Sequence, residues 1–110
     1  MESQTAAAPP LACVPGAIDP AERPAHFALV EHLFGTLAEA REALPDGYDF
    51  RFPAEAFDQV ARFVANERKC CPFLRFAIEL PPGGGPLWLR LTGPEGTTAF
   101  LDAEFHLDAG

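Results

Sequence analysis

Pro53 and Pro72 constrain this chain more than any other feature, because they fix where one helix begins and ends. Proline is favoured in the first turn of a helix, and the residue before a proline avoids helical dihedral angles. Between the two prolines, apolar residues recur at intervals of three and four, as on one face of a helix: Phe57, Val60, Ala61 and Val64. The spacing predicts a helix over residues 54–70.

Three other stretches alternate apolar residues with polar or charged ones, which is typical of half-buried strands. They predict strands over residues 48–52, 74–80 and 87–92, the last two joined as an antiparallel hairpin by a glycine-rich loop. Helical spacing predicts two further helices, over residues 26–44 and 95–105. The order helix-strand-helix-strand-strand-helix predicts an α+β fold, a small three-stranded sheet with three helices packed on it.

The beginning of the chain differs in composition from the rest. It is rich in alanine and proline, lacks any periodicity and carries Cys13. We therefore expect residues 1–24 to form a flexible tail and residues 25–110 to form a single α+β domain.

The net charge of −8, from 16 acidic and 8 basic residues, argues against two classes of partner. Nucleic acid and anionic membrane surfaces would be repelled rather than attracted. The N-terminus lacks a basic region and a sustained apolar run, and no stretch approaches the roughly 18 apolar residues of a membrane helix. We therefore expect a cytoplasmic protein that binds neither nucleic acid nor membrane, in a compartment where thiols stay reduced.

The chemically distinctive feature is the adjacent pair Cys70 and Cys71, directly before Pro72. Neighbouring Cα atoms lie about 3.8 Å apart, below the usual disulfide range, so a bond between the two would be strained. Their side chains converge only where regular structure breaks, and Pro72 places such a break after Cys71. Two sulfur donors favour soft ions such as Hg(II), As(III) or Cu(I), whereas the spacing does not fit a structural zinc site.

A helical wheel centred on Phe57 places the residues around the pair. Cys71 falls on the apolar stripe, Cys70 beside it, Arg68 in its middle and Glu67 at its edge. Arg68 is then part of a structural ion pair, or an arginine that snorkels off the end of the core, or a cation that lowers a cysteine pKa.

Cys13 and the histidines carry weaker signals. Cys13 is either an unremarkable tail residue or a third ligand to a metal ion, since the tail is long enough to reach the pair. His26 and His32 lie six residues apart, so they do not share a helix face as a ligand pair would, and both are expected on the surface.

Two alternatives compete with ion binding. Buried cysteines often pack as small hydrophobic residues, in which case the protein is a non-enzymatic interaction module. The alternating aromatics of residues 48–52 and the first helix offer enough apolar surface to suggest a homodimer. A thiol redox or transfer enzyme is the other alternative, although no histidine lies near Cys70 in sequence to act as its base.

Two blocks of the sequence resemble a family of small, mostly uncharacterised bacterial proteins. The first runs from Glu67 through Arg68, Cys70, Cys71 and Pro72 to Phe73, and matches the family pattern E-R-x-C-C-P-F. The second, residues 91–96, matches L-T-G-P-x-G. The family is associated with mercury or arsenic resistance gene neighbourhoods. The resemblance implies a protein for thiophilic ions with Cys70 and Cys71 as the matched residues; it implies no reaction and assigns no role to Cys13.

Overall fold

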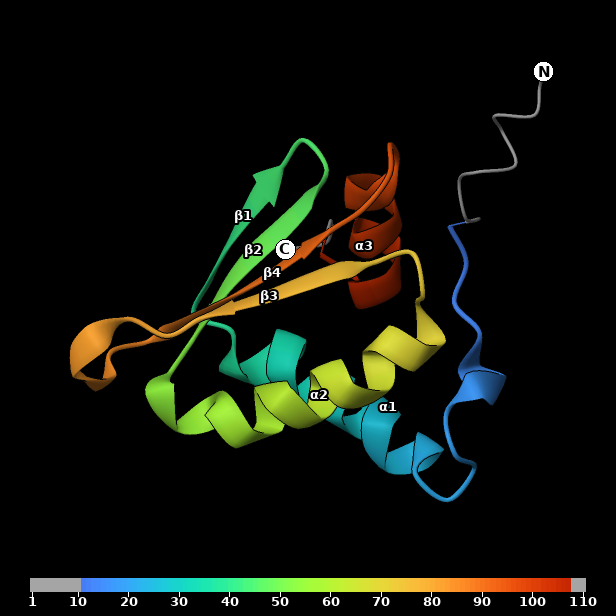
Figure 1. The fold of residues 1–110 in the computed structure, drawn as a ribbon, viewed down its shortest axis with the longest axis horizontal. Coiled ribbons are helices and arrows are strands. Elements are labelled where there is room, and N and C mark those ends of the chain that lie inside the picture. Colours follow the sequence, from blue (N-terminus) through green and yellow to red (C-terminus); the bar gives the residue numbers. More distant parts are fainter. Residues whose placement is uncertain (1–10, 108–110) are drawn as a thin grey trace.

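The structure is a computed structural model that describes residues 11–107. It is an α+β fold with one antiparallel sheet and three α-helices (Figure 1). The sheet has four strands in the order β1-β2-β4-β3, namely β1 (Ala40–Leu44), β2 (Gly47–Phe52), β3 (Arg75–Glu79) and β4 (Leu87–Thr92). The helices are α1 (Arg23–His32), α2 (Phe57–Cys70) and α3 (Thr97–Phe105). The α+β class and the three helices are confirmed, whereas the three-stranded sheet and its element order are wrong by one strand.

The extra strand is β1, which lies inside the helix predicted over residues 26–44. Helix α1 ends at His32, a π-helical turn follows over Leu33–Leu37, and the chain is extended from Ala38. Gly35 and Thr36 weaken the helix at this turn, because both have low helix propensity. β1 then pairs with β2, and this pairing outweighs the helix-forming character of the β1 residues.

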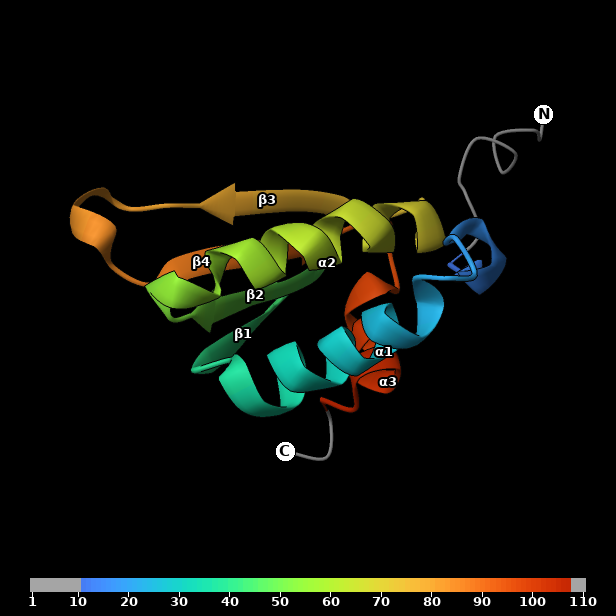
Figure 2. The same ribbon diagram turned by 90° about the horizontal axis from the view of Figure 1, so that it is seen from below.

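One face of the sheet is apolar and forms one side of the hydrophobic core. The register places Tyr48 opposite Leu91, Phe50 opposite Leu89 and Phe52 opposite Leu87, all of them buried. Helices α2 and α3 contact the sheet, and α1 runs beside α2 (Figure 2). The other face is polar, with an ion pair between Arg90 and Asp49 and the Arg51 guanidinium over Trp88.

The burial of the β2 aromatics bears on association. Tyr48, Phe50 and Phe52 are 7%, 1% and 0% exposed within a single chain. They therefore offer no surface to a second copy, and this reason for expecting a homodimer is wrong. The homodimer itself stays a prediction.

Helix α2 follows the sequence prediction closely. Pro53 precedes a single 3-10 turn, Ala54–Ala56, and α2 then continues to Cys70. Cys71 leaves the helical region with φ −118° and ψ 79°, as the following proline requires. The predicted end of the helix at the cysteine pair is confirmed.

The segment predicted as a tail lies against the domain as far as the structure describes it. Residues 1–10 lie outside the described residues. From Leu11 the chain runs along the end of α2, where the Val14 N–H donates to the Cys70 carbonyl at 2.6 Å. Ile18 is fully buried, and the Arg23 side chain donates to its carbonyl. This contact brings Cys13 next to the cysteine pair.

The hairpin between β1 and β2 depends on Gly47. A Cβ atom at this position would overlap the backbone oxygen of Leu91 on β4. We expect Gly47→Ala to lower the free energy of unfolding by about 3 kcal/mol, because the strands must separate to admit the methyl group. Urea denaturation measures this. Gly16→Ala is the control, since nothing lies within 4 Å of its Cβ position, and an equal effect of both variants would contradict the expectation.

Candidate functional site

Three cysteines converge at the C-terminal end of α2. Cys70 is the last residue of the helix, Cys71 follows it, and Cys13 reaches them from the N-terminal segment. Their three sulfur atoms lie within 4.8 Å of one another. The fold therefore places Cys13, the third candidate ligand, beside the predicted pair Cys70 and Cys71.

Two of the three sulfurs are joined. Cys13 and Cys71 form a disulfide across 58 residues of sequence, with their Cα atoms 4.6 Å apart. Cys70 is a free cysteine and only 3% exposed. The sequence-based expectation that Cys71 is a thiol is therefore wrong for this state of the protein. Adjacent cysteines do not bond to each other here; one of them bonds to a distant cysteine whose geometry permits it.

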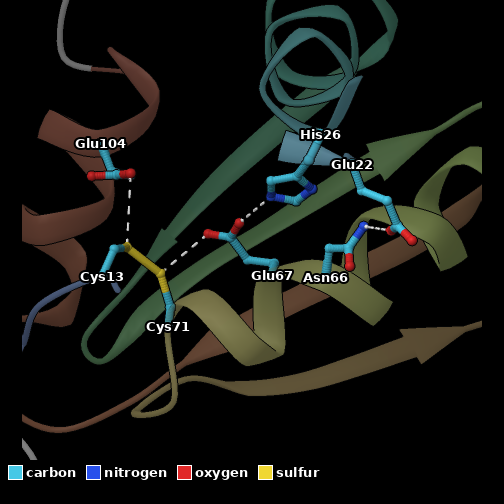
Figure 3. A network of polar contacts seen from close by, with 7 residues as sticks. All are labelled: Cys13, Glu22, His26, Asn66, Glu67, Cys71 and Glu104. Atoms are coloured by element: carbon cyan, nitrogen blue, oxygen red, sulfur yellow. Dashed lines mark hydrogen bonds and ion pairs between the residues drawn. A yellow bond between two sulfur atoms is a disulfide. The ribbon is translucent and has the colours of Figure 1, made fainter. Parts of the chain in front are cut away.

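A buried carboxylate lies beside this disulfide. Glu67 is 3% exposed, and its Oε2 lies 3.3 Å from the Sγ of Cys71 (Figure 3). Its Oε1 accepts a hydrogen bond from Nε2 of His26 at 2.9 Å, with His26 itself 3% exposed. On the opposite side, Oε2 of Glu104 lies 3.8 Å from the Sγ of Cys13 (Figure 3). Carboxylates thus flank both ends of the disulfide.

The position of His26 explains how a glutamate is accommodated in the core. A buried carboxylate is costly unless it is paired and hydrogen-bonded. His26 on α1 stacks on Phe63 of α2 with ring centroids 5.9 Å apart, which presents Nε2 to Glu67. Nδ1 has no hydrogen-bond partner among the described residues. Nε2 is therefore the ring nitrogen through which His26 pairs with the Glu67 carboxylate.

The wheel placed the charged residues of α2 in the wrong positions. Glu67 is buried and Arg68 is exposed, the reverse of the expected arrangement. The error comes from centring the wheel on Phe57, which is 39% exposed; the buried face passes instead through Val60, Phe63 and Cys70. None of the ion pairs within residues 11–107 includes Arg68, so its expected pairing with a carboxylate or a sulfur is wrong.

The electrostatic setting raises the pKa of the Cys70 thiol. Burial is the largest cause, and the negative charges of Glu67 and Glu104 add to it, while a backbone hydrogen bond from Val14 acts in the opposite direction. The predicted lowering of a cysteine pKa by Arg68 is therefore wrong for Cys70. Glu104 also has a raised pKa, from partial burial and from Glu67, against a lowering by His106.

Cys70 has access to a cavity despite its burial. The cavity measures about 390 Å³ and lies between α1, the end of α2 and α3. Cys70, Glu67 and Glu104 contribute to its lining, together with the aromatic side chains of Phe27, Phe34 and Phe105. Cys70 is therefore the one cysteine of the three that lines this cavity.

Two residues of the site were missed by sequence reasoning. His26 was expected on the surface, and Glu104 was not singled out at all. His26 lies 41 residues from Glu67 in sequence, and Glu104 lies 91 residues from Cys13. The exposure of His32 is as expected. No local pattern distinguishes His26 from His32, because only the packing of α1 on α2 decides which of them is buried.

The raised pKa of Cys70 gives a direct prediction for Glu67→Gln. Removal of the negative charge lowers the pKa of the Cys70 thiol, so the thiolate fraction at pH 8 rises. We expect severalfold faster alkylation by iodoacetamide in the oxidised protein, where Cys70 is the only free cysteine of the described chain. Mass spectrometry over time gives the rate.

A matched variant tests whether the effect comes from this one carboxylate. Glu31 lines the same cavity but is not among the groups that shift the Cys70 pKa. Glu31→Gln should therefore leave the alkylation rate unchanged. A rate that stays unchanged or falls in Glu67→Gln would contradict the electrostatic account.

Comparison with known proteins adds no further assignment. No protein-family model matches the chain, and neither the curated proteins nor the solved structures contain a match. Within residues 11–107, no helix has the length and apolar character needed to cross a membrane. The functional argument therefore depends on the geometry of the three sulfur atoms and their surroundings.

Proposed function

We propose that the reduced protein binds a soft, thiophilic ion, such as Hg(II), As(III) or Cu(I), through Cys13, Cys70 and Cys71. The observation that carries this proposal is the separation of the three sulfur atoms, all within 4.8 Å of one another. Soft sulfur ligands select soft ions over Mg²⁺ or Ca²⁺, which prefer oxygen.

The chemistry of the donor set favours As(III) in particular. Trivalent arsenic takes three thiolate ligands, and three thiolates balance its charge. Burial of Cys70 and Cys71 shields the ion from water, since these residues are 3% and 0% exposed. Arsenite enters as neutral arsenous acid, so three S–H and three As–O bonds break, three As–S bonds form, and the thiol protons leave with the hydroxyl groups as three water molecules.

The disulfide makes binding depend on the redox state. Two of the three ligands are tied to each other in the oxidised protein. Their release requires two electrons and two protons, which a dithiol supplies as it becomes a disulfide. Glu67, adjacent to Cys71, is placed to accept a hydrogen bond from the thiol that forms.

Anaerobic titration of the reduced protein tests the proposal. As(III), Hg(II), Cu(I) and Zn(II) are added separately, and binding is followed by thiolate-to-metal absorbance and by native mass spectrometry. We expect one soft ion per chain, weak binding of Zn(II), and loss of tight binding after oxidation to the disulfide. Tight binding that is equal in the oxidised and reduced protein would contradict the three-sulfur site.

In the cell, such a protein would sequester the ion, in keeping with its resemblance to proteins associated with mercury or arsenic resistance. This role is part of the proposal. It gains support from the buried sulfur ligands, which suit retention of an ion better than rapid exchange.

A second candidate is a thiol redox function, which the free Cys70 beside a disulfide favours. The Cys70 thiolate would attack the Sγ of Cys13, form a Cys70–Cys13 bond and release Cys71 as a thiolate. The released thiolate would take up a proton near Glu67 and His26. Mapping of the disulfides after partial reduction distinguishes this exchange, because it predicts a Cys13–Cys70 species.

A further inference from the structure

The cavity beside Cys70 is larger than a bare ion needs. Its volume of about 390 Å³ falls in the range of sites for small organic molecules. Cys70 lines it, whereas Cys13 and Cys71 do not, so the cavity lies on one side of the sulfur cluster. An ion held by the sulfurs would leave this space available to a group attached to the ion.

The walls of the cavity suit an uncharged aromatic group. Phe27, Phe34 and Phe105 supply aromatic surface, and Phe34 and Phe105 are themselves stacked with ring centroids 4.3 Å apart. Aromatic rings attract one another in stacked and edge-on arrangements. The charged lining residues are mainly acidic, with Glu31, Glu67 and Glu104 against Arg41, so an anionic substituent would be repelled.

We propose that the cavity holds the organic substituent of an arylarsenic(III) compound whose arsenic atom is bonded to Cys70 and one further cysteine sulfur. This inference rests on the proposed function and specifies its substrate class. The organic group takes the place of the third sulfur, so only two of the three cysteines bond to arsenic at a time. All three sulfurs lie close enough for either Cys13 or Cys71 to be the second ligand.

The bonds made and broken in this step balance. An arylarsonous acid carries one arsenic–carbon bond and two hydroxyl groups. Two thiols react with it, so that two S–H and two As–O bonds break, two As–S bonds form and two water molecules leave. Arsenic stays trivalent and the arsenic–carbon bond is retained, so no oxidant or reductant is consumed beyond the dithiol that first opens the disulfide.

A matched pair of ligands tests the proposal on the fully reduced chain. Methylarsonous acid and phenylarsonous acid each take two thiolates and differ only in the organic group. We expect the phenyl compound to bind about tenfold more tightly or better, because its ring loses contact with water in the cavity. Inorganic arsenite is titrated in parallel as the measure of the proposed function.

Gly35 provides the variant that isolates the cavity. It lines the cavity, and nothing lies within 4 Å of its Cβ position, so a leucine side chain fits there and occupies part of the space. Gly35→Leu should reduce the phenyl preference to near one while arsenite binding persists. Gly16→Leu, at an equally open position outside the cavity, should keep the preference. Phe27→Ala, at a residue 44% exposed, removes an aromatic wall without filling the space and should also reduce the preference.

The outcomes separate the two proposals. Equal affinity for the methyl and phenyl compounds, with arsenite still bound, would overturn the cavity proposal and leave the ion site intact. A phenyl preference that survives both Gly35→Leu and Phe27→Ala would overturn it as well. Failure of all three arsenicals to bind would overturn this inference and the As(III) binding on which it rests; if Hg(II) and Cu(I) also fail to bind the reduced chain, the proposed function is overturned with it. Persistent arsenite binding shows that each variant is folded.

Discussion

Serine at position 70 or 71 is expected to weaken As(III) binding to the reduced protein by roughly a thousandfold, equivalent to about 4 kcal/mol. A serine oxygen is a hard ligand that does not replace a thiolate toward a soft ion. Both positions are buried, at 3% and 0% exposed, so water cannot substitute easily for the lost ligand. Isothermal titration or competition with a small dithiol gives the affinities under anaerobic conditions.

The Cys13→Ser variant reports the number of sulfurs that bind each ion. For As(III), which takes three thiolates, Cys13→Ser should cost as much as the other two replacements. For Hg(II), which is satisfied by two thiolates in a linear arrangement, Cys70 and Cys71 suffice, and Cys13→Ser should have a smaller effect. This contrast follows from the position of Cys13 within 4.8 Å of the pair.

The serine series also decides between binding and packing. If all three serine variants bind As(III) like the wild type, the cysteines are packing residues and the protein is better regarded as an interaction module. Circular dichroism of each variant is the necessary control, because a hydroxyl group at a buried cysteine position carries a desolvation cost. Arg68→Gln serves as a matched surface change on the same turn and should leave the affinity unchanged, since Arg68 is exposed.

Local signals in the sequence were sufficient for the central part of the fold. Helix α2 has a proline before it and a proline after it, and β3 and β4 alternate regularly on either side of a glycine-rich loop. These patterns involve neighbouring residues, so sequence alone predicts them. Strand β1 was missed from sequence alone because its residues are good helix formers, and only their pairing with β2 makes them a strand.

The candidate site was predictable to the same limited extent. The adjacent cysteines and the helix end at Pro72 are local features, and the predicted end of the helix at the pair is confirmed. Cys13 was an open candidate from the sequence, and only the packing of the N-terminal segment decides that it joins the site. His26 and Glu104 join from segments far away in sequence, so only the packing of α1 and α3 around α2 reveals them. The wrong prediction that Arg68 rather than Glu67 faces the core also comes from contacts with distant segments. A carboxylate becomes acceptable in the core only because His26 on another helix is there to pair with it.

Loss of the Cys13–Cys71 disulfide should lower the free energy of unfolding by about 4 kcal/mol, the chain-entropy value for a loop of this length. Cys13→Ser in the oxidised protein provides the measurement by urea denaturation, and Cys70→Ser is the matched control that leaves the bond in place. The double variant Cys13→Ser/Cys71→Ser should cost little more than either single one, because both remove the same bond. Equal stability of oxidised wild type and Cys13→Ser would contradict the disulfide.

The same experiment connects stability to the proposed function. Reduction removes the covalent link between the N-terminal segment and the end of α2, and a bound ion would restore it through sulfur bonds to Cys13 and the pair. A ligand that binds only the folded chain raises its stability in proportion to the logarithm of its concentration over Kd. The reduced wild type should therefore regain much of the lost stability when As(III) is added, whereas reduced Cys13→Ser should regain little. Recovery to the same extent in both would show that Cys13 does not hold the ion.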